Sequence, residues 1–305
     1  MEPELRRAQV LMHAAIVLWG FTGILGRVIT LDALPLVWWR MLITVPMLYV
    51  VARWRGPVQW PDLRDLLRIS GVGVVIAVHW LTFYGSIKLA NASVAASCLA
   101  STALFTAIAA PFIFKIPFRP SELLLGLSAM AGIALMFKFQ DVYSTGILVG
   151  LISAATSGLF TIFNKTLLER HRPEVLLFIE ITAGFVAVSI ITPFVTDLGT
   201  FPAPDSHDLF WLFVLSAFCT VLPMQMSYRA LRHITPFVMN LSINLEPIYT
   251  MLVAAWLFGE HQQLHAGFYA GTAIIIGSVA LNGVFRSDLM QRNILKARRK
   301  LSDSD

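Results

Sequence analysis

Charged residues are scarce in this chain of 305 residues: Asp, Glu, Lys and Arg together make up 13% of it, and hydrophobic residues 57%. A soluble globular domain is about a quarter charged, so the deficit predicts an integral membrane protein in contact with the lipid bilayer. The net charge of +5 comes from basic residues that are scattered between apolar runs. Because they do not gather on one soluble face, no nucleic-acid partner is expected.

Cysteines and the common enzyme motifs are few or missing as well. Only Cys98 and Cys219 occur, both within apolar runs, which argues against a disulfide framework. The chain contains no G-x-x-x-x-G-K-[ST], G-x-S-x-G or H-E-x-x-H motif, and "HQQLH" places His261 and His265 four apart without the glutamate of a zinc protease. We therefore expect no enzyme, no catalytic residues, and neither a metal nor a cofactor.

Long apolar runs are what the chain does have. An α-helix needs about 20 residues to cross about 30 Å of hydrocarbon, and it satisfies its backbone groups within the segment. Ten runs qualify, so we predict an all-α integral membrane protein with ten transmembrane helices. The predicted spans are Val10–Thr30, Ala33–Ala52, Ile69–Lys88, Asn91–Lys115, Ser121–Lys138, Thr145–Lys165, Glu174–Val195, Asp208–Arg229, Thr235–Phe258 and His265–Phe285.

The basic residues flank these spans unevenly and predict the orientation. If the N-terminus is cytoplasmic, the outer loops hold only Lys88 and Lys138, and the stretch Thr196–Asp208 has no Lys or Arg. The inner loops then hold Arg6, Arg7, Arg53, Arg55, Arg64, Arg68, Lys115, Arg119, Lys165, Arg170, Arg172, Arg229 and Arg232. By the positive-inside rule, both termini are expected in the cytoplasm. The expected location is a bacterial inner membrane. The basic tail, residues 286–305, either lies on the anionic inner leaflet or is solvated.

The two halves of the chain resemble each other. "AAIVLWGFTGILGRVIT" aligns with "ISAATSGLFTIFNKTLL", and "LANASVAASCLASTALFTAIAAPFIFKIPF" aligns with "LRHITPFVMNLSINLEPIYTMLVAAWLFGE". Each half holds five spans, an odd number, so the second half enters the membrane from the opposite side as an inverted repeat. The expected units are residues 1–140, residues 141–285 and the tail. Inverted repeats are typical of secondary transporters with a substrate site near the midplane.

Three stretches are similar to a known family. "LWGFTGILGRVI", "LPLVWWRMLITVPML" and "NLEPIYTMLVAAWLFGE" resemble the helix 1, helix 2 and helix 9 signatures of EamA-type transporters of the drug/metabolite transporter superfamily. The resemblance covers nearly the whole chain. It implies two inverted five-helix repeats around a central cavity, and export of a small metabolite, often an amino acid or related compound. In one departure, Leu104 stands where the second half has Glu246, so the Glu-Pro pair occurs in one half alone.

The ninth predicted span carries a carboxylate and a helix breaker near its centre. At 100° per residue, Ser242, Glu246 and Tyr249 share one arc, whereas Asn244 lies about half a turn away and Pro247 removes a backbone donor. An ionised carboxylate in hydrocarbon is costly. Either Glu246 binds substrate or exchanges a proton in a cavity, or it supports a kink together with Asn244 and Pro247. The sequence leaves both interpretations open.

Further polar side chains within the spans are candidates for the cavity. Arg40 in the second span and Glu180 in the equivalent place of the seventh have opposite charges, which suits a gate or, for Arg40, a substrate carboxylate. Snorkelling or a buried structural pair are the alternatives. His79, beside Trp80, is either a hydrogen-bonded core histidine or a cavity residue that titrates with Glu246. Trp80 either packs or forms an aromatic wall.

Two more groups complete the candidate set. Gln225 follows Pro223 in a helix that the proline is expected to kink, and its amide is a candidate cavity group. Ser97 and Ser101 belong to a stripe of small residues, which indicates either close helix packing or a cavity wall opposite the ninth span.

Taken together, these features predict a secondary active transporter that exports a small metabolite, an amino acid or related amphipathic compound, by alternating access. Proton coupling through Glu246 stays open. The alternative is a channel, or a lipid- or drug-binding membrane protein without active transport. The expected partners are the small-molecule substrate, the bilayer and, if coupled, protons. We expect a monomer or weak homodimer.

Overall fold

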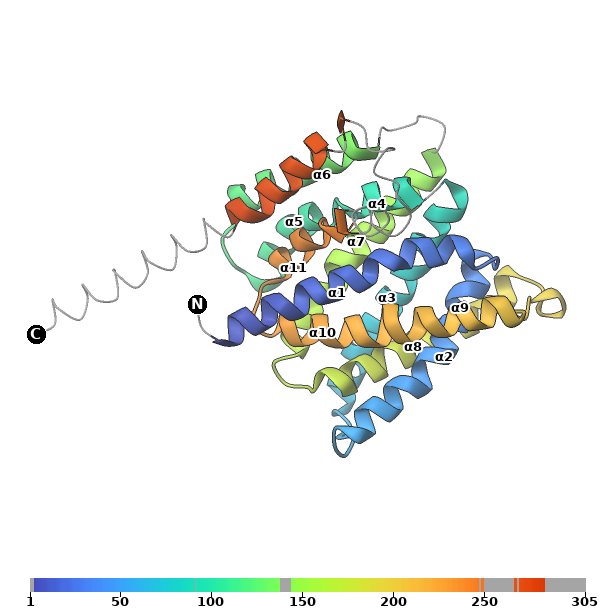
Figure 1. Ribbon diagram of the computed structural model, residues 1–305. Helices are drawn as coiled ribbons and strands as arrows, with labels where there is room; N and C mark the ends of the chain where they lie inside the picture. Colours follow the sequence, from blue (N-terminus) through green and yellow to red (C-terminus); the bar gives the residue numbers. More distant parts are fainter. Residues whose placement is uncertain are drawn as a thin grey trace, which may run out of the picture.

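A computed structural model describes residues 3–90, 92–137, 144–246, 248–249, 266–267 and 269–282, and only the backbone of residues 27, 92, 93 and 97. These residues form helices connected by short loops, and no strand occurs among them (Figure 1). The α-helices of the first half are α1 (Pro3–Val28), α2 (Ala33–Trp54), α3 (Leu63–Leu89), α4 (Ala92–Leu99), α5 (Thr102–Phe114) and α6 (Pro120–Phe137). Those of the second half are α7 (Ser144–Leu167), α8 (Pro173–Val195), α9 (Ser206–Ser216), α10 (Leu222–Leu231), α11 (Pro236–Ile243) and an unlabelled helix, Tyr269–Asn282, with a 3-10 turn η2 (Leu198–Thr200) and a π-helical turn η3 (Ala217–Val221).

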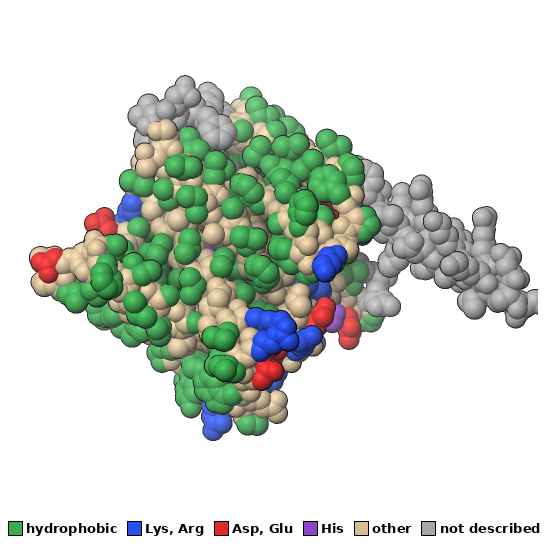
Figure 2. All heavy atoms as spheres, turned by 180° about the vertical axis from the view of Figure 1, so that it is seen from behind, with side chains coloured by type: hydrophobic (Ala, Val, Ile, Leu, Met, Phe, Trp, Pro, Cys, Tyr) green, Lys and Arg blue, Asp and Glu red, His purple; other side chains and the backbone are tan. Residues whose placement is uncertain are grey.

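Each of the ten predicted spans coincides with helix, wholly or in part, among the described residues. In the described part of the chain, six helices are long and apolar enough to cross a membrane, counting α9, η3 and α10 as one continuous helix, Ser206–Leu231. Large apolar side chains such as Phe112 and Phe194 are 78% and 84% exposed, as lipid-facing residues are. Figure 2 shows an apolar band across one face, with charged side chains toward its two ends. The prediction of an all-α membrane protein is therefore confirmed.

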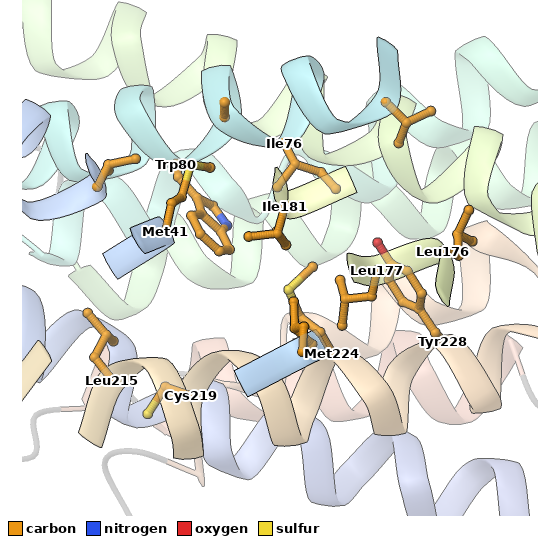
Figure 3. Packing of buried hydrophobic residues seen from close by; sticks show 14 of the residues in the cluster. Met41, Ile76, Trp80, Leu176, Leu177, Ile181, Leu215, Cys219, Met224 and Tyr228 are labelled. Carbon is orange, nitrogen blue, oxygen red and sulfur yellow. The ribbon is translucent and has the colours of Figure 1, made fainter. Parts of the chain in front are cut away.

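Helices of the first half pack mainly against helices of the second. The most extensive contacts join α3 to α7 and α8, α2 to α8, and α1 to α10. A two-fold relation between the halves makes such contacts reciprocal: α3 on α7 matches α10 on α1, and α3 on α8 matches α9 on α2. The apolar core lies where these helices meet, and Figure 3 shows Met41, Ile76, Ile181 and Met224 of four helices in it.

Two glycines let α3 and α8 approach closely. A Cβ atom on Gly73 would collide with the backbone oxygen of Glu180, and one on Gly184 would lie 2.7 Å from the backbone oxygen of Gly73. Small residues at helix crossings allow this kind of contact between backbones in membrane proteins. The crossing holds Glu180 in the core of the molecule.

The fourth and ninth predicted spans are both interrupted. In the fourth, α4 ends at Leu99 and α5 begins at Thr102, with the Ser101 hydroxyl donating to the backbone oxygen of Cys98 at 2.6 Å. In the ninth, α11 ends at Ile243 and a turn at Asn244 follows, before Glu246. Discontinuous helices in transporters line cavities, since their free backbone groups need polar surroundings.

Candidate functional site

A cavity of about 90 Å³ lies between the two halves of the chain. Residues from α1, α2, α3 and α4 of the first half meet residues from α7, α10 and α11 of the second half and Glu246. Its wall is made of Trp19, Thr22, Arg40, His79, Trp80, Phe83, Leu99, Ser157, Phe160, Thr161, Asn164, Met224, Ser227, Tyr228, Leu231, Met239, Ile243 and Glu246. The interior thus combines an aromatic wall with a cation, a carboxylate and several hydroxyl groups.

Arg40 is the buried cation of this cavity, with 3% of its surface exposed. Its Nε donates to the Thr220 hydroxyl at 2.9 Å and one terminal nitrogen donates to the Tyr84 hydroxyl at 2.9 Å. The guanidinium carbon lies 3.9 Å from the ring centre of Trp80, a cation–π contact. Within the described part of the chain, no carboxylate lies within 4 Å of the guanidinium. Its buried charge is therefore held by neutral groups.

The π-helical turn η3 supplies part of the Arg40 environment. Pro223 has no backbone N–H, so the oxygen of Cys219, four residues earlier, lacks its helical donor. That oxygen accepts a long hydrogen bond of 3.5 Å from Arg40. The wider turn also lets the Thr220 hydroxyl donate to the oxygen of Leu215 at 2.9 Å while it accepts from Arg40. Single π-turns often occur at functional sites.

Glu180 is the second fully buried charge-bearing side chain near the cavity. The Tyr228 hydroxyl donates to one of its carboxyl oxygens at 2.6 Å, and the Asn164 amide donates to the Tyr228 hydroxyl at 2.7 Å. The other carboxyl oxygen has no hydrogen-bond partner among the described residues. Asn164 and Tyr228 line the cavity, so they connect Glu180 to its interior.

Arg40 and Glu180 occupy equivalent positions in the repeat. In each half, a charged residue eight positions into the second helix is hydrogen-bonded to a tyrosine of the third: Arg40 to Tyr84, and Glu180 to Tyr228. α2 packs against α8, yet no ion pair joins Arg40 to Glu180 among the described residues.

His79 lies in the aromatic part of the wall. Its Nδ1 is 2.9 Å from both the hydroxyl and the backbone oxygen of Ser153 on α7, and its ring contacts Phe83 and Phe160. The histidine therefore joins α3 to α7, and it also lines the cavity. His79 is thus both a hydrogen-bonded histidine and a cavity residue, and its titration together with Glu246 stays a prediction.

Four of the nine predicted cavity residues line this cavity: Arg40, His79, Trp80 and Glu246. Four others lie outside its wall. Ser242 and Ser101 are buried, and the Tyr249 hydroxyl is hydrogen-bonded to His13 Nδ1 at 2.8 Å. Gln225 is buried, and its amide has no hydrogen-bond partner in the part of the chain that is described.

The remaining candidates concern the interrupted or kinked helices. The side chain of Ser97 and all of Pro247 lie outside the described residues. Asn244 is 2% exposed, and its amide nitrogen has no partner among the described groups. Pro223 is buried in the helix that follows η3.

Sequence reasoning missed the polar face of α7. Ser153, Ser157, Thr161 and Asn164 are buried on one face, and the last three line the cavity. Their spacing of four, four and three residues in an otherwise apolar span is a helical signal that could have identified them. Tyr228 was missed because nothing in its own helix distinguishes a cavity-facing tyrosine from one that packs.

Comparisons with known proteins agree with this architecture. A description of the EamA-like transporter family matches residues 6–138 and again residues 144–284. An uncharacterized transporter of Pseudomonas aeruginosa, PA0485, is 25% identical over 276 residues, which are 85% of this chain and 87% of that protein. A crystal structure of a protein with 13% identity shares the fold, with a TM-score of 0.74 over 91% of this chain and 98% of its own.

The repeated match, the apolar helices and a polar cavity between the halves define a membrane transporter built from an internal repeat. The chain belongs to the EamA-like transporter family, within the drug/metabolite transporter superfamily.

Proposed function

We propose that this protein is a secondary active transporter that exports a small metabolite by alternating access, and that its substrate is an amino acid or a related amphipathic zwitterion. The cavity supports this proposal because it lies between two halves that rock against each other in such carriers. The proposed units are residues 1–140, 141–285 and the basic tail 286–305. The proposed membrane is the bacterial inner membrane, with both termini in the cytoplasm.

The substrate class is inferred from the environment of Arg40. A guanidinium has five N–H donors, and three contacts are made here, to a hydroxyl, a second hydroxyl and a carbonyl. The donors that remain suit a planar carboxylate, which arginine binds in a bidentate manner. A substrate carboxylate would supply the counter-charge that the described residues do not place beside Arg40.

Glu246 and the aromatic residues complete the proposed recognition. Glu246 shares the cavity wall with Arg40 but lies beyond ion-pair distance, so both ends of a zwitterion can be held at once. A substrate ammonium group would bind near Glu246. Trp19, Phe83 and Phe160 offer apolar surface to the substrate side chain.

Proton coupling is proposed through the same carboxylate. If protonation of Glu246 and binding of the substrate ammonium exclude each other, a proton gradient drives the exchange of one for the other. Glu180 is a second acid connected to the cavity through Tyr228 and Asn164. It contacts the cavity indirectly, so Glu246 is the first residue to test.

A two-stage experiment tests the proposed function. Purified protein is screened by thermal shift against zwitterionic amino acids, the matching amines and the matching carboxylic acids, and the best ligand is taken into proteoliposomes. We expect stabilisation by zwitterions above either single-charge analogue, and saturable flux. Equal stabilisation by the amine alone would remove Arg40 from recognition. A flux that never saturates would indicate a channel, and binding without flux a ligand-binding protein.

A further inference from the structure

A second cavity, of about 420 Å³, is lined by residues near the beginning of α1 and the end of α10. Figure 1 shows these two helix ends at the same end of the molecule. None of the cavity's described lining residues also lines the central cavity. Five arginines converge on the second cavity from four parts of the fold: Arg7, Arg55, Arg172, Arg229 and Arg232. The first two belong to the first half of the chain, and the other three to the second.

The acidic residues in this basic pocket do not balance the arginines. Glu174 pairs with Arg229 at 2.6 Å and lies 3.8 Å from Arg172, so a single carboxylate is shared by two guanidinium groups. Among the described lining residues, the one other carboxylate is that of Glu4, which is 76% exposed and lies 3.6 Å from His233. The basic pocket therefore keeps an excess of positive charge.

The five arginines differ in how firmly they are held. Arg172 donates to the backbone oxygen of Pro57 at 3.1 Å, and Arg232 donates to that of His171 at 2.9 Å. The side chains of Arg7 and Arg55, by contrast, make no ion pair within the described part of the chain. The pocket thus has a fixed wall on the side of α8 and α10, and two cations on the opposite side that are available to a ligand.

The surroundings place this pocket at a membrane boundary. Trp54, next to Arg55, is 86% exposed at the end of α2, and Val10 on α1 is 62% exposed. Exposed tryptophans at helix ends are typical of the headgroup level of a bilayer. Figure 2 shows Lys and Arg side chains gathered toward one end of the apolar band. A concave group of arginines at this depth suits phosphate, which arginine binds in a bidentate manner.

We propose that the basic pocket binds the phosphate of an anionic phospholipid headgroup on the cytoplasmic leaflet. The assignment to that leaflet rests on the orientation proposed above. The bound phosphate contacts Arg7 and Arg55 from one half and Arg172 and Arg229 from the other, so it joins the two halves at this end of the molecule. The ligand class is a phosphodiester lipid with a net negative charge, and the bilayer is its source.

Lipid binding is measured on the full chain by native mass spectrometry and by thermal shift, with phosphatidylglycerol, phosphatidylcholine or inorganic phosphate added to the delipidated protein. We expect retention of phosphatidylglycerol and a higher unfolding temperature, and neither effect with phosphatidylcholine. The double variant Arg7→Gln, Arg55→Gln should bind phosphatidylglycerol about 30-fold more weakly. It should still fold, since neither side chain makes an ion pair among the described residues.

The matched control is Arg6→Gln, Arg53→Gln, which removes the same charge from neighbouring exposed arginines that do not line the basic pocket. It should bind phosphatidylglycerol as the wild type does. Equal weakening in both double variants would overturn the proposal in favour of general surface attraction. Inorganic phosphate that reproduces the full shift would overturn the lipid source. The measurement needs no transport, so its outcome is separate from that of the proposed function.

Discussion

Among single residues, Arg40 is a buried charge that several different groups stabilise. A guanidinium buried in a membrane protein is costly, and here a π-turn, a proline-freed carbonyl, a tyrosine hydroxyl and the face of Trp80 share its charge. Replacing Arg40 is expected to lower transport activity more than stability, because its remaining N–H donors are proposed to bind the substrate. Its position in the second predicted span could be anticipated from the charge alone. Its partners could not, because they come from α3 and from η3.

The tyrosine between Asn164 and Glu180 offers a test at the same scale. In Tyr228→Phe, a buried carboxyl oxygen loses its donor and the Asn164 amide loses its acceptor. We expect the free energy of unfolding to fall by about 1–3 kcal/mol. Thermal unfolding of the purified protein measures the loss. Tyr49→Phe is the control, because Tyr49 is 47% exposed and should change stability by less than about 0.5 kcal/mol. Equal stability of the two variants would contradict the proposed network.

At the scale of elements, hydropathy predicted where helices lie but not where they break. The ten apolar runs all contain helix, since length and composition decide that property. No proline in the sequence predicts the interruption between Leu99 and Thr102, where the Ser101 hydroxyl takes part in the turn instead. The π-turn is likewise set by contact with Arg40 as well as by Pro223. Such features depend on a partner helix, which a single span does not reveal.

The crossing of α3 and α8 provides a prediction for elements. Gly73→Ala places a Cβ against the backbone oxygen of Glu180, so the helices must separate, at a cost of about 1–3 kcal/mol. Gly71→Ala, two residues earlier on the same helix, meets nothing within 4 Å and should gain about 0.5–1 kcal/mol from helix propensity. Thermal unfolding should therefore shift in opposite directions for the two variants. A shift in the same direction would argue against close packing at Gly73.

In the whole molecule, some features follow the internal repeat and others depart from it. The reciprocal helix contacts and the two charged residue–tyrosine pairs follow the repeat, whereas the signs of Arg40 and Glu180 are opposite. Glu246 also has no counterpart, because Leu104 occupies its place in the first half. The repeat could be read from the sequence. The cavity could not be assembled from it, because half of its polar wall comes from α7 and α10, across the interface between the halves.

Glu246 provides a prediction about coupling. In Glu246→Gln, the side chain keeps its shape but cannot exchange a proton, so an imposed pH gradient should no longer accelerate transport in proteoliposomes. Exchange without a gradient should persist. Glu169→Gln, an exposed change of the same kind, should keep the gradient dependence of the wild type. If Glu246→Gln retains that dependence, Glu246 takes no part in coupling.

The most direct test of the central claim is counterflow of a labelled amino acid in proteoliposomes, measured for the wild type and for Arg40→Lys. Alternating access with a substrate carboxylate on Arg40 predicts saturable uptake that unlabelled substrate inside the vesicles accelerates. It also predicts an apparent KM at least about tenfold higher in Arg40→Lys, since lysine lacks the bidentate geometry. Uptake without saturation or acceleration, or a KM that Arg40→Lys leaves unchanged, would contradict it.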